Sequence, residues 1–159
     1  MPGFELIGEE ERRAVNELFD DGGILFAHGF DSMRNERYHV REFEKNFAKY
    51  LGVKYAQAVS SGTAAIKIAL VALGVKPGEE VITQAFTFIA TAEAIIDIGA
   101  IPVFVNIDET LNLDPNELES AITSKTAAII PVHMLGVAVE QDKIHAIAKK
   151  HKIPVLDDA

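Results

Sequence analysis

The sequence predicts an α/β fold with three layers, α/β/α, around a mostly parallel sheet. Two observations predict it. From about residue 53 onward, short apolar segments alternate with segments whose apolar residues recur at helical spacing. The apolar segments are also nearly continuous, without the polar alternation of a strand that has one face in water. Helices should therefore cover both faces of the sheet.

The part of the chain before residue 53 predicts two helices joined by an irregular stretch. Residues Glu9–Phe19 have helical spacing, and the run Asp20–Gly23 ends that helix. The stretch Ile24–Arg37 has no clean period, so we expect it to be irregular. A second amphipathic helix, ended by Gly52, follows from four apolar residues at helical spacing: Val40, Phe43, Phe47 and Leu51.

After residue 53, strands and helices are expected in alternation. The expected strands are Tyr55–Val59, Glu80–Thr83, Ile101–Val105, Ala127–Val132 and Pro154–Asp157. The expected helices are Thr63–Leu73, Thr87–Ile98, Pro115–Ala121 and Glu140–His151. The third of these helices has a clear start signal, with Asp114 at the N-cap and Glu117 placed to complete a capping box. No internal repeat or linker is visible, so we expect one domain.

Composition restricts the class of protein. The chain has 159 residues, of which 48% are hydrophobic and 25% charged, which is typical of one globular domain. A formal net charge of -9 argues against nucleic acid or an anionic membrane as a partner. The absence of cysteine excludes disulfides and thiolate metal sites. No apolar run is long enough to cross a bilayer and the N-terminus lacks a signal-peptide pattern, so we expect a cytoplasmic protein. We also expect no metal site, because Asp157 and Asp158 have no clustered histidines beside them in the sequence.

Polar and aromatic residues follow the ends of the expected strands, which is where open α/β sheets bind ligands. The run Ser60–Thr63 follows the first strand and begins a helix, so its free N–H groups and the helix dipole suit a phosphate. An ordinary helix N-cap explains the same residues. Gln84–Phe88 follow the second strand and His133 follows the fourth, while Asp157 and Asp158 end the fifth. These groups should face one crevice.

The residues in this crevice indicate the kind of ligand. No Gly-x-Gly-x-x-Gly or Walker A pattern is present, which argues against a dinucleotide. A planar, cationic, phosphorylated ring would use all the groups at once. Ser61, Gly62 and Thr63 would hold its phosphate. Phe88 would stack on the ring and Asp158 would pair with a protonated ring nitrogen. Pyridoxal 5'-phosphate has these features.

Four motifs, in this order and at this spacing, resemble those of the DegT/DnrJ/EryC1/StrS family of pyridoxal-phosphate-dependent sugar aminotransferases. They are Ser61–Ala65, Ala85–Thr91, Pro131–Gly136 and Pro154–Ala159, and the segments Glu42–Glu44 and Gly99–Phe104 are similar too. The resemblance extends from about Phe4 to the last residue. It implies the aspartate aminotransferase type of fold (fold type I), with phosphate contacts from Gly62 and Thr63, ring stacking by Phe88 and Asp158 at the pyridine nitrogen.

The chain departs from the family pattern at its end. In the family, the lysine that forms the Schiff base comes well after the aspartate motif, whereas this chain ends at Ala159. We therefore expect an incomplete large domain: residues 1–52 form N-terminal helices and a substrate-side loop, and residues 53–159 form the alternating core. We expect the C-terminal remainder of that domain to lie outside this chain. No catalytic residue is then expected within the chain, which should be inactive by itself.

Substrate choice is expected to depend on the irregular stretch. The segments Met1–Leu6 and Phe30–Asn35 resemble family members that make 8-amino-3,8-dideoxy-manno-octulosonate, a free sugar acid. We expect Arg34 or Arg37 to receive the carboxylate of such a substrate through a bidentate fork. Pairing of these arginines with neighbouring acidic residues or with solvent is an equal alternative.

His133 is a further candidate for contact with the substrate, although a histidine after an apolar strand more often satisfies a backbone group. Asp157 is expected to have a structural role.

The resemblance implies a sugar substrate, an amino-acid donor (glutamate) and a homodimer. Two alternatives stay open from the sequence. One is a sugar dehydratase of the same family, and the other is a non-catalytic α/β module that binds a phosphorylated small molecule.

Overall fold

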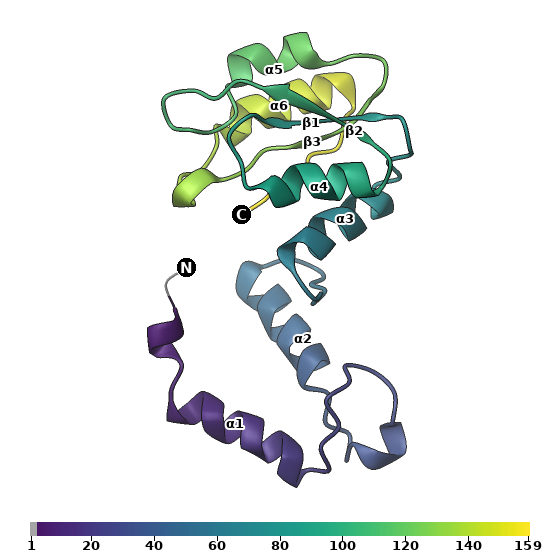
Figure 1. Cartoon of the computed structure of the whole chain (residues 1–159), viewed down its shortest axis with the longest axis vertical. Coiled ribbons are helices and arrows are strands. Elements are labelled where there is room, and N and C mark those ends of the chain that lie inside the picture. Colours follow the sequence, from purple (N-terminus) through teal and green to yellow (C-terminus); the bar gives the residue numbers. More distant parts are fainter. Residues whose placement is uncertain (1–2) are drawn as a thin grey trace. The chain divides into compact units, whose positions relative to one another are not determined.

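The computed structural model describes residues 3–159, so part of the N-terminal motif, residues 1 and 2, lies outside the described residues. The chain forms two compact units that divide between Ala58 and Val59. Figure 1 shows the elements of both, and each unit is described here by itself.

The first unit contains the two predicted helices, α1 (Glu9–Asp20) and α2 (His39–Leu51), and two short 3-10 turns, η1 (Phe4–Leu6) and η2 (Asp31–Met33). Gly52 ends α2 as predicted. Its φ of 68° lies in the left-handed region, which glycine adopts without strain. The stretch between the helices is irregular apart from η2, as predicted.

The second unit is built on a parallel sheet of three strands, β1 (Glu80–Gln84), β2 (Ile101–Val105) and β3 (Thr126–Ile130). The strand order is β2-β1-β3, so β1 is central and its residues are almost entirely buried. All pairings are parallel, with the carboxyl ends of the strands at one edge of the sheet. This edge is where α/β sheets place their ligands.

Helices cover both faces of this sheet, which confirms the predicted three layers (Figure 1). Helices α3 (Gly62–Ala72) and α4 (Ile89–Asp97) pack on one face, and α5 (Pro115–Ala121) and α6 (Gln141–His151) on the other. Neighbouring residues of β1 divide between the two cores: Val81 packs toward α3 and α4, and Ile82 toward α5 and α6. Each such fully buried side chain contributes about 1.5–3 kcal/mol.

The prediction of a first strand at Tyr55–Val59 was wrong. The structure has no strand there, and Tyr55 is 76% exposed. A strand needs a neighbour to accept its backbone hydrogen bonds, and none of the described strands pairs with this segment. The backbone N–H of Ala58 donates instead to the Glu44 carboxylate at 2.9 Å. An apolar run therefore did not suffice to make a strand.

The last expected strand, Pro154–Asp157, is present only as two isolated parallel bridges to the chain around β3, Ile129 with Val155 and Val132 with Asp158. Backbone hydrogen bonds accompany them, including Asp158 N–H to Pro131 at 3.0 Å and His133 N–H to the Asp158 carbonyl at 2.9 Å. This short edge pairing places Asp158 beside the carboxyl end of β3.

Two helix starts differ in detail from the prediction. Asp114 caps α5, its side chain accepting from Asn116 N–H at 2.8 Å, but the capping box is not closed. The Asp114 N–H already donates to the Asn106 carbonyl, and the Glu117 carboxylate accepts from the Asn106 side chain. Helix α4 begins at Ile89 rather than Thr87, because Phe88 is extended.

Among the described residues, no helix has the length and apolar character that a membrane crossing requires.

Candidate functional site

A cavity of about 300 Å³ opens at the carboxyl edge of the sheet in the second unit. Ten residues line it: Gly62, Thr63, Ile66, Thr87, Phe88, Ala90, Thr91, Val132, Met134 and Asp158. They come from the start of α3, the start of α4, the chain after β3 and the end of the chain. The structure thus brings Gly62, Thr63, Phe88 and Asp158 together, although almost 100 residues of sequence separate the first from the last. The volume of the cavity is at the lower end of the range for small-molecule sites.

The first turn of α3 supplies free backbone donors to this cavity. The Ser61 hydroxyl accepts from Ala64 N–H at 3.1 Å and caps the helix. The N–H groups of Gly62 and Thr63 have no intrahelical acceptor, because they belong to the first turn. Apart from its two chain neighbours and the adjoining backbone of α3, no heavy atom of the described chain lies within 4 Å of the position of a Cβ at Gly62, so packing does not require glycine there. Ser61 therefore positions the turn, and Gly62 and Thr63 present it to the cavity.

Phe88 lies beside the cavity with its ring uncovered. The residue is the N-cap of α4 in an extended conformation, and 75% of it is exposed. A core role for this aromatic side chain is therefore excluded. An exposed phenyl ring at the wall of a cavity can stack on a flat ligand, an arrangement worth about 0.5–1.5 kcal/mol beyond area burial.

Asp158 completes the cavity at the opposite end of the sequence. Its Oδ2 accepts a hydrogen bond from the Thr91 hydroxyl at 2.9 Å, and the Thr91 hydroxyl lies 3.0 Å from that of Thr87. The neighbouring carboxylate of Asp157 has different partners, with His133 Nε2 at 3.4 Å and His145 Nε2 at 3.9 Å. The two adjacent acidic residues therefore do not converge on one point.

Gln84, at the end of β1, holds together the backbone around the cavity. Its side chain is fully buried. The Oε1 atom accepts from the N–H groups of Leu113 (3.2 Å) and Val132 (3.0 Å). The Nε2 group donates to the carbonyls of Phe86 (2.9 Å) and Leu111 (3.2 Å). All four hydrogen-bonding positions of the amide are used, so Gln84 fixes the two segments that carry Phe88 and Val132.

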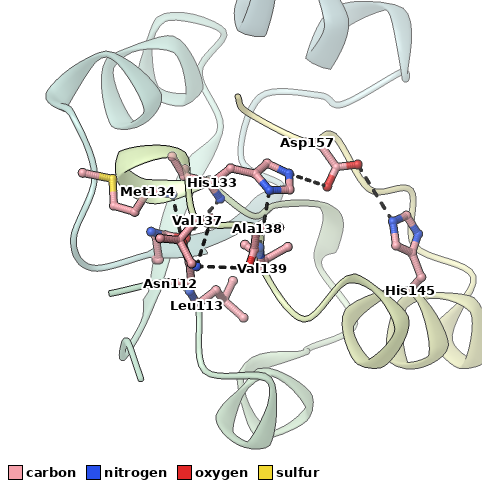
Figure 2. A network of polar contacts seen from close by, with 11 residues as sticks. Asn112, Leu113, His133, Met134, Val137, Ala138, Val139, His145 and Asp157 are labelled. Carbon is pink, nitrogen blue, oxygen red and sulfur yellow. Dashed lines mark hydrogen bonds and ion pairs between the residues drawn. The ribbon is translucent and has the colours of Figure 1, made fainter. Parts of the chain in front are cut away.

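His133 and Asn112 brace the loop after β3, as Figure 2 shows. Asn112 is buried and accepts from Met134 N–H at 2.9 Å, while its Nδ2 donates to the Val137 and Ala138 carbonyls at 3.2 and 3.4 Å. His133 Nδ1 accepts from Val139 N–H at 3.4 Å. An accepting nitrogen carries no proton, so the ring proton lies on Nε2, toward Asp157. Both nitrogens of His133 thus have protein partners, and His133 is not among the residues that line the cavity.

Arg34 and Arg37 lie in the first unit, where both guanidinium groups have partners. Arg34 is 8% exposed and donates to the backbone carbonyls of Phe26, His28 and Gly29. It thereby closes the irregular stretch around itself. Arg37 forms an ion pair with Asp21.

Tyr38 lies beside these arginines. Its ring lies 5.3 Å from the Arg34 guanidinium carbon, within range of a cation–π contact. The Tyr38 hydroxyl donates to the Asp31 carboxylate, and this hydrogen bond raises the pKa of Tyr38. Asp31 is therefore paired with Tyr38 and not with either arginine.

The sequence did not predict the hydrogen bonds of three polar residues of the second unit: Thr91, which was expected to have a helix-start and packing role, Gln84, which was expected to face the crevice, and Asn112. A signal existed for two of them. Gln84 is a polar residue at the end of an apolar strand, and Thr91 lies one helical turn after Thr87. Their partners are distant in sequence, 67 residues in the case of Thr91 and Asp158, so the pairing itself could not be derived.

Comparison with known proteins gives matches over nearly the whole chain. A model of the "DegT/DnrJ/EryC1/StrS aminotransferase family" matches residues 8–159. The spore coat polysaccharide biosynthesis protein SpsC of Bacillus subtilis is 46% identical over 155 residues, which are 97% of this chain and 37% of that protein. The UDP-2-acetamido-2-deoxy-3-oxo-D-glucuronate aminotransferase of Pseudomonas aeruginosa is 51% identical over 121 residues, 76% of this chain and 34% of that protein.

The same similarity is found among solved structures. The crystal structure of NtdA from Bacillus subtilis with bound cofactor PMP is similar with a TM-score of 0.83 and 38% identity, over 97% of this chain and 34% of that one. The present chain therefore spans only a little over a third of the length of the relatives that it matches.

Proposed function

Because this chain belongs to the DegT/DnrJ/EryC1/StrS aminotransferase family, we propose that it is the N-terminal part of a pyridoxal-phosphate-dependent sugar aminotransferase. The observation that carries the proposal is the shared cavity, in which a helix start, an uncovered aromatic ring and a carboxylate meet. We further propose that residues 1–52 form the N-terminal helices and a substrate-side loop of the large domain and that residues 53–159 form its alternating core.

The residues around the cavity fit the cofactor. The free N–H groups of Gly62 and Thr63, together with the dipole of α3, suit a phosphate, and the open space beside Gly62 leaves room for it. The exposed face of Phe88 suits an aromatic ring. The Asp158 carboxylate suits a protonated ring nitrogen, in a charge-assisted hydrogen bond worth about 1.5–3 kcal/mol. Ser61 acts indirectly, as the cap that orders the phosphate turn.

Each of these residues then has one task in the reaction. When bound, pyridoxal phosphate supplies an electron sink for carbanion chemistry. Asp158 keeps the proton on the ring nitrogen, since a carboxylate next to a cationic N–H favours the protonated form. Phe88 and the turn at Gly62 fix the plane and the phosphate end of the ring. The lysine that binds the cofactor covalently is proposed to lie in the part of the enzyme beyond Ala159, so this chain alone is proposed to be inactive.

The substrate is proposed to be a keto or aldehyde sugar, with glutamate as the amino donor and 8-amino-3,8-dideoxy-manno-octulosonate as a candidate product. A carboxylate contact from Arg34 or Arg37 remains a prediction. In the structure Arg34 donates to loop carbonyls and Arg37 to Asp21, so a substrate carboxylate would have to compete with these partners. For His133 we propose a bracing role in preference to substrate contact, because both ring nitrogens have protein partners. A homodimer in the cytoplasm is proposed from the family alone.

The test uses the full-length protein, purified without cofactor. We expect added pyridoxal 5'-phosphate to give a visible absorbance band distinct from that of the free compound, and glutamate to yield 2-oxoglutarate. Acceptors to compare are the 8-oxo precursor of the sugar acid and UDP-linked keto sugars. If the amino group is transferred to neither acceptor and a sugar loses water instead, the enzyme is a dehydratase. No binding of the cofactor at all would refute the proposal.

Two variants with a matched control connect the test to the cavity. Asp158→Asn and Phe88→Ala should each weaken binding of the cofactor, whereas Asp157→Asn should not, because Asp157 faces His133 and His145. Equal effects of Asp157→Asn and Asp158→Asn on cofactor affinity would show that the assignment of the carboxylates is mistaken.

A further inference from the structure

We propose that Thr91 is a positioning residue, whose hydroxyl orients the Asp158 carboxylate toward the cofactor ring. This inference rests on the proposed function, since it assigns a second residue to the task of Asp158. The hydroxyl donates to Oδ2 of Asp158 at 2.9 Å, and both residues line the cavity.

The directions of the hydrogen bonds follow from the number of protons available. An ionised carboxylate only accepts, so the single hydroxyl proton of Thr91 is used toward Asp158. The oxygen of Thr91 must then accept from Thr87, whose hydroxyl lies 3.0 Å away. The result is a directed chain from Thr87 through Thr91 to Asp158. Hydrogen bonds in such a chain polarise and strengthen one another.

The scaffold around Thr91 is rigid enough for a positioning role. Thr91 is 2% exposed and lies in the first turn of α4, next to the buried Ala92. Asp158, by contrast, lies outside any helix or strand and is held by isolated backbone bridges. The helix therefore holds Thr91 in place, and Thr91 in turn holds the carboxylate of Asp158. Only Oδ2 of Asp158 is bonded within the described residues, which leaves Oδ1 for the ligand.

The neighbouring acidic residue, Asp157, does not share the contact with Thr91. Asp157 has histidine partners at 3.4 and 3.9 Å, and its carboxylate is directed to the loop after β3 and to α6. Adjacent residues of an extended segment direct their side chains to opposite sides, so only one of the two carboxylates can reach the cavity. The backbone bridge between Val132 and Asp158 places Asp158 at the cavity, and the hydrogen bond from Thr91 then sets the rotation of its carboxylate.

The experiment measures cofactor binding and the state of the ring, and it does not depend on turnover. The full-length protein without cofactor is titrated with pyridoxal 5'-phosphate, and the 15N NMR shift of cofactor labelled at the pyridine nitrogen is recorded. Thr91→Val keeps the shape of the side chain and removes the hydroxyl. We expect about tenfold weaker binding, equivalent to about 1.4 kcal/mol, and a 15N shift displaced toward that of the unprotonated ring.

Two further variants separate positioning from a structural role. Thr91→Ser retains the hydroxyl and should restore both the affinity and the 15N shift. Thr83→Val removes another fully buried hydroxyl of the same unit, which donates to the Ile130 carbonyl at 2.8 Å away from the cavity. It should leave affinity and 15N shift at the wild-type values. If Thr91→Val does not fold, Thr91→Ala provides the same comparison with a smaller side chain.

The outcomes distinguish this inference from the proposed function. A wild-type protein that binds no cofactor would refute both. A wild-type protein that binds it, with a Thr91→Val variant of equal affinity and unchanged 15N shift, would refute only the role of Thr91. Loss of affinity in Thr91→Ser as large as in Thr91→Val would also overturn it, since the hydroxyl would then not be the cause.

Discussion

Replacing Gln84 by leucine should be the most damaging single change among the polar residues of the second unit. Leucine has a similar size, fits a buried position and removes every polar contact of the side chain. The amide of Gln84 serves four backbone groups of three segments that are separate in sequence. The substitution therefore tests whether one side chain connects the wall of the cavity to the sheet.

The size of the effect follows from where the four partners lie. The N–H groups of Leu113 and Val132 are buried and would be left without an acceptor. The carbonyls of Phe86 and Leu111 belong to residues that are partly exposed, so water can replace their partner. An unsatisfied buried group costs about 1–3 kcal/mol, so the two N–H groups together predict a loss of about 2–6 kcal/mol.

The assay is urea unfolding of the full-length protein without cofactor, with Thr83→Val as the control. Thr83 is on the same strand and equally buried, but its hydroxyl makes only one hydrogen bond, so a loss of about 1 kcal/mol is expected. Gln84→Leu should also weaken cofactor binding, because the segments that carry Phe88 and Val132 lose their common partner. A loss of stability no larger than that of Thr83→Val would contradict the reasoning.

Two further predictions concern contacts outside the cavity. Arg34→Lys should expose the stretch 24–37 to limited proteolysis, on the order of tenfold faster, because one ammonium group cannot replace a planar fork that donates to several carbonyls; an unchanged cleavage pattern would speak against this role. Lys150 and His151 donate to the Glu119 carboxylate and hold its pKa below the ordinary value of 4.5. Because the pKa of Glu119 is lowered in the folded state, its contacts stabilise the fold at pH values above 4.5, and this stabilisation is lost as the pH falls through the lowered pKa. The difference in Tm between wild type and Glu119→Gln should therefore disappear in acid, and a difference that is constant with pH would exclude the contact as its cause.

Part of the candidate site could be predicted because its signals are local. The end of α2 at Gly52, the cap of α3 at Ser61 and the start of α5 at Asp114 depend on residues within one helical turn. The four motifs that resemble the aminotransferase family are likewise read from short runs of sequence. Such signals do not require knowledge of what lies nearby in space.

The prediction of Tyr55–Val59 as a strand shows where local signals end. Its composition is that of a buried strand, yet a strand exists only if a second strand accepts its hydrogen bonds, and no described strand does so. Arg34 and Arg37 also show that local sequence does not identify the partners of a side chain. Their charge was visible in the sequence, but the carbonyl partners of Arg34 are determined by the path of the loop.

The sequence by itself thus determined the α/β class, the order of the helices and of the three strands, and the residue types that suit a phosphate, a ring and a cationic nitrogen. Only the tertiary structure decided that Thr91 contacts Asp158, that Gln84 joins three segments and that His133 turns to Asp157. These contacts join residues up to 67 positions apart. A hydrogen bond depends on distance and angle at atomic scale, and for groups so far apart in the chain both are set by the packing of helices on the sheet, which no local pattern of residues encodes.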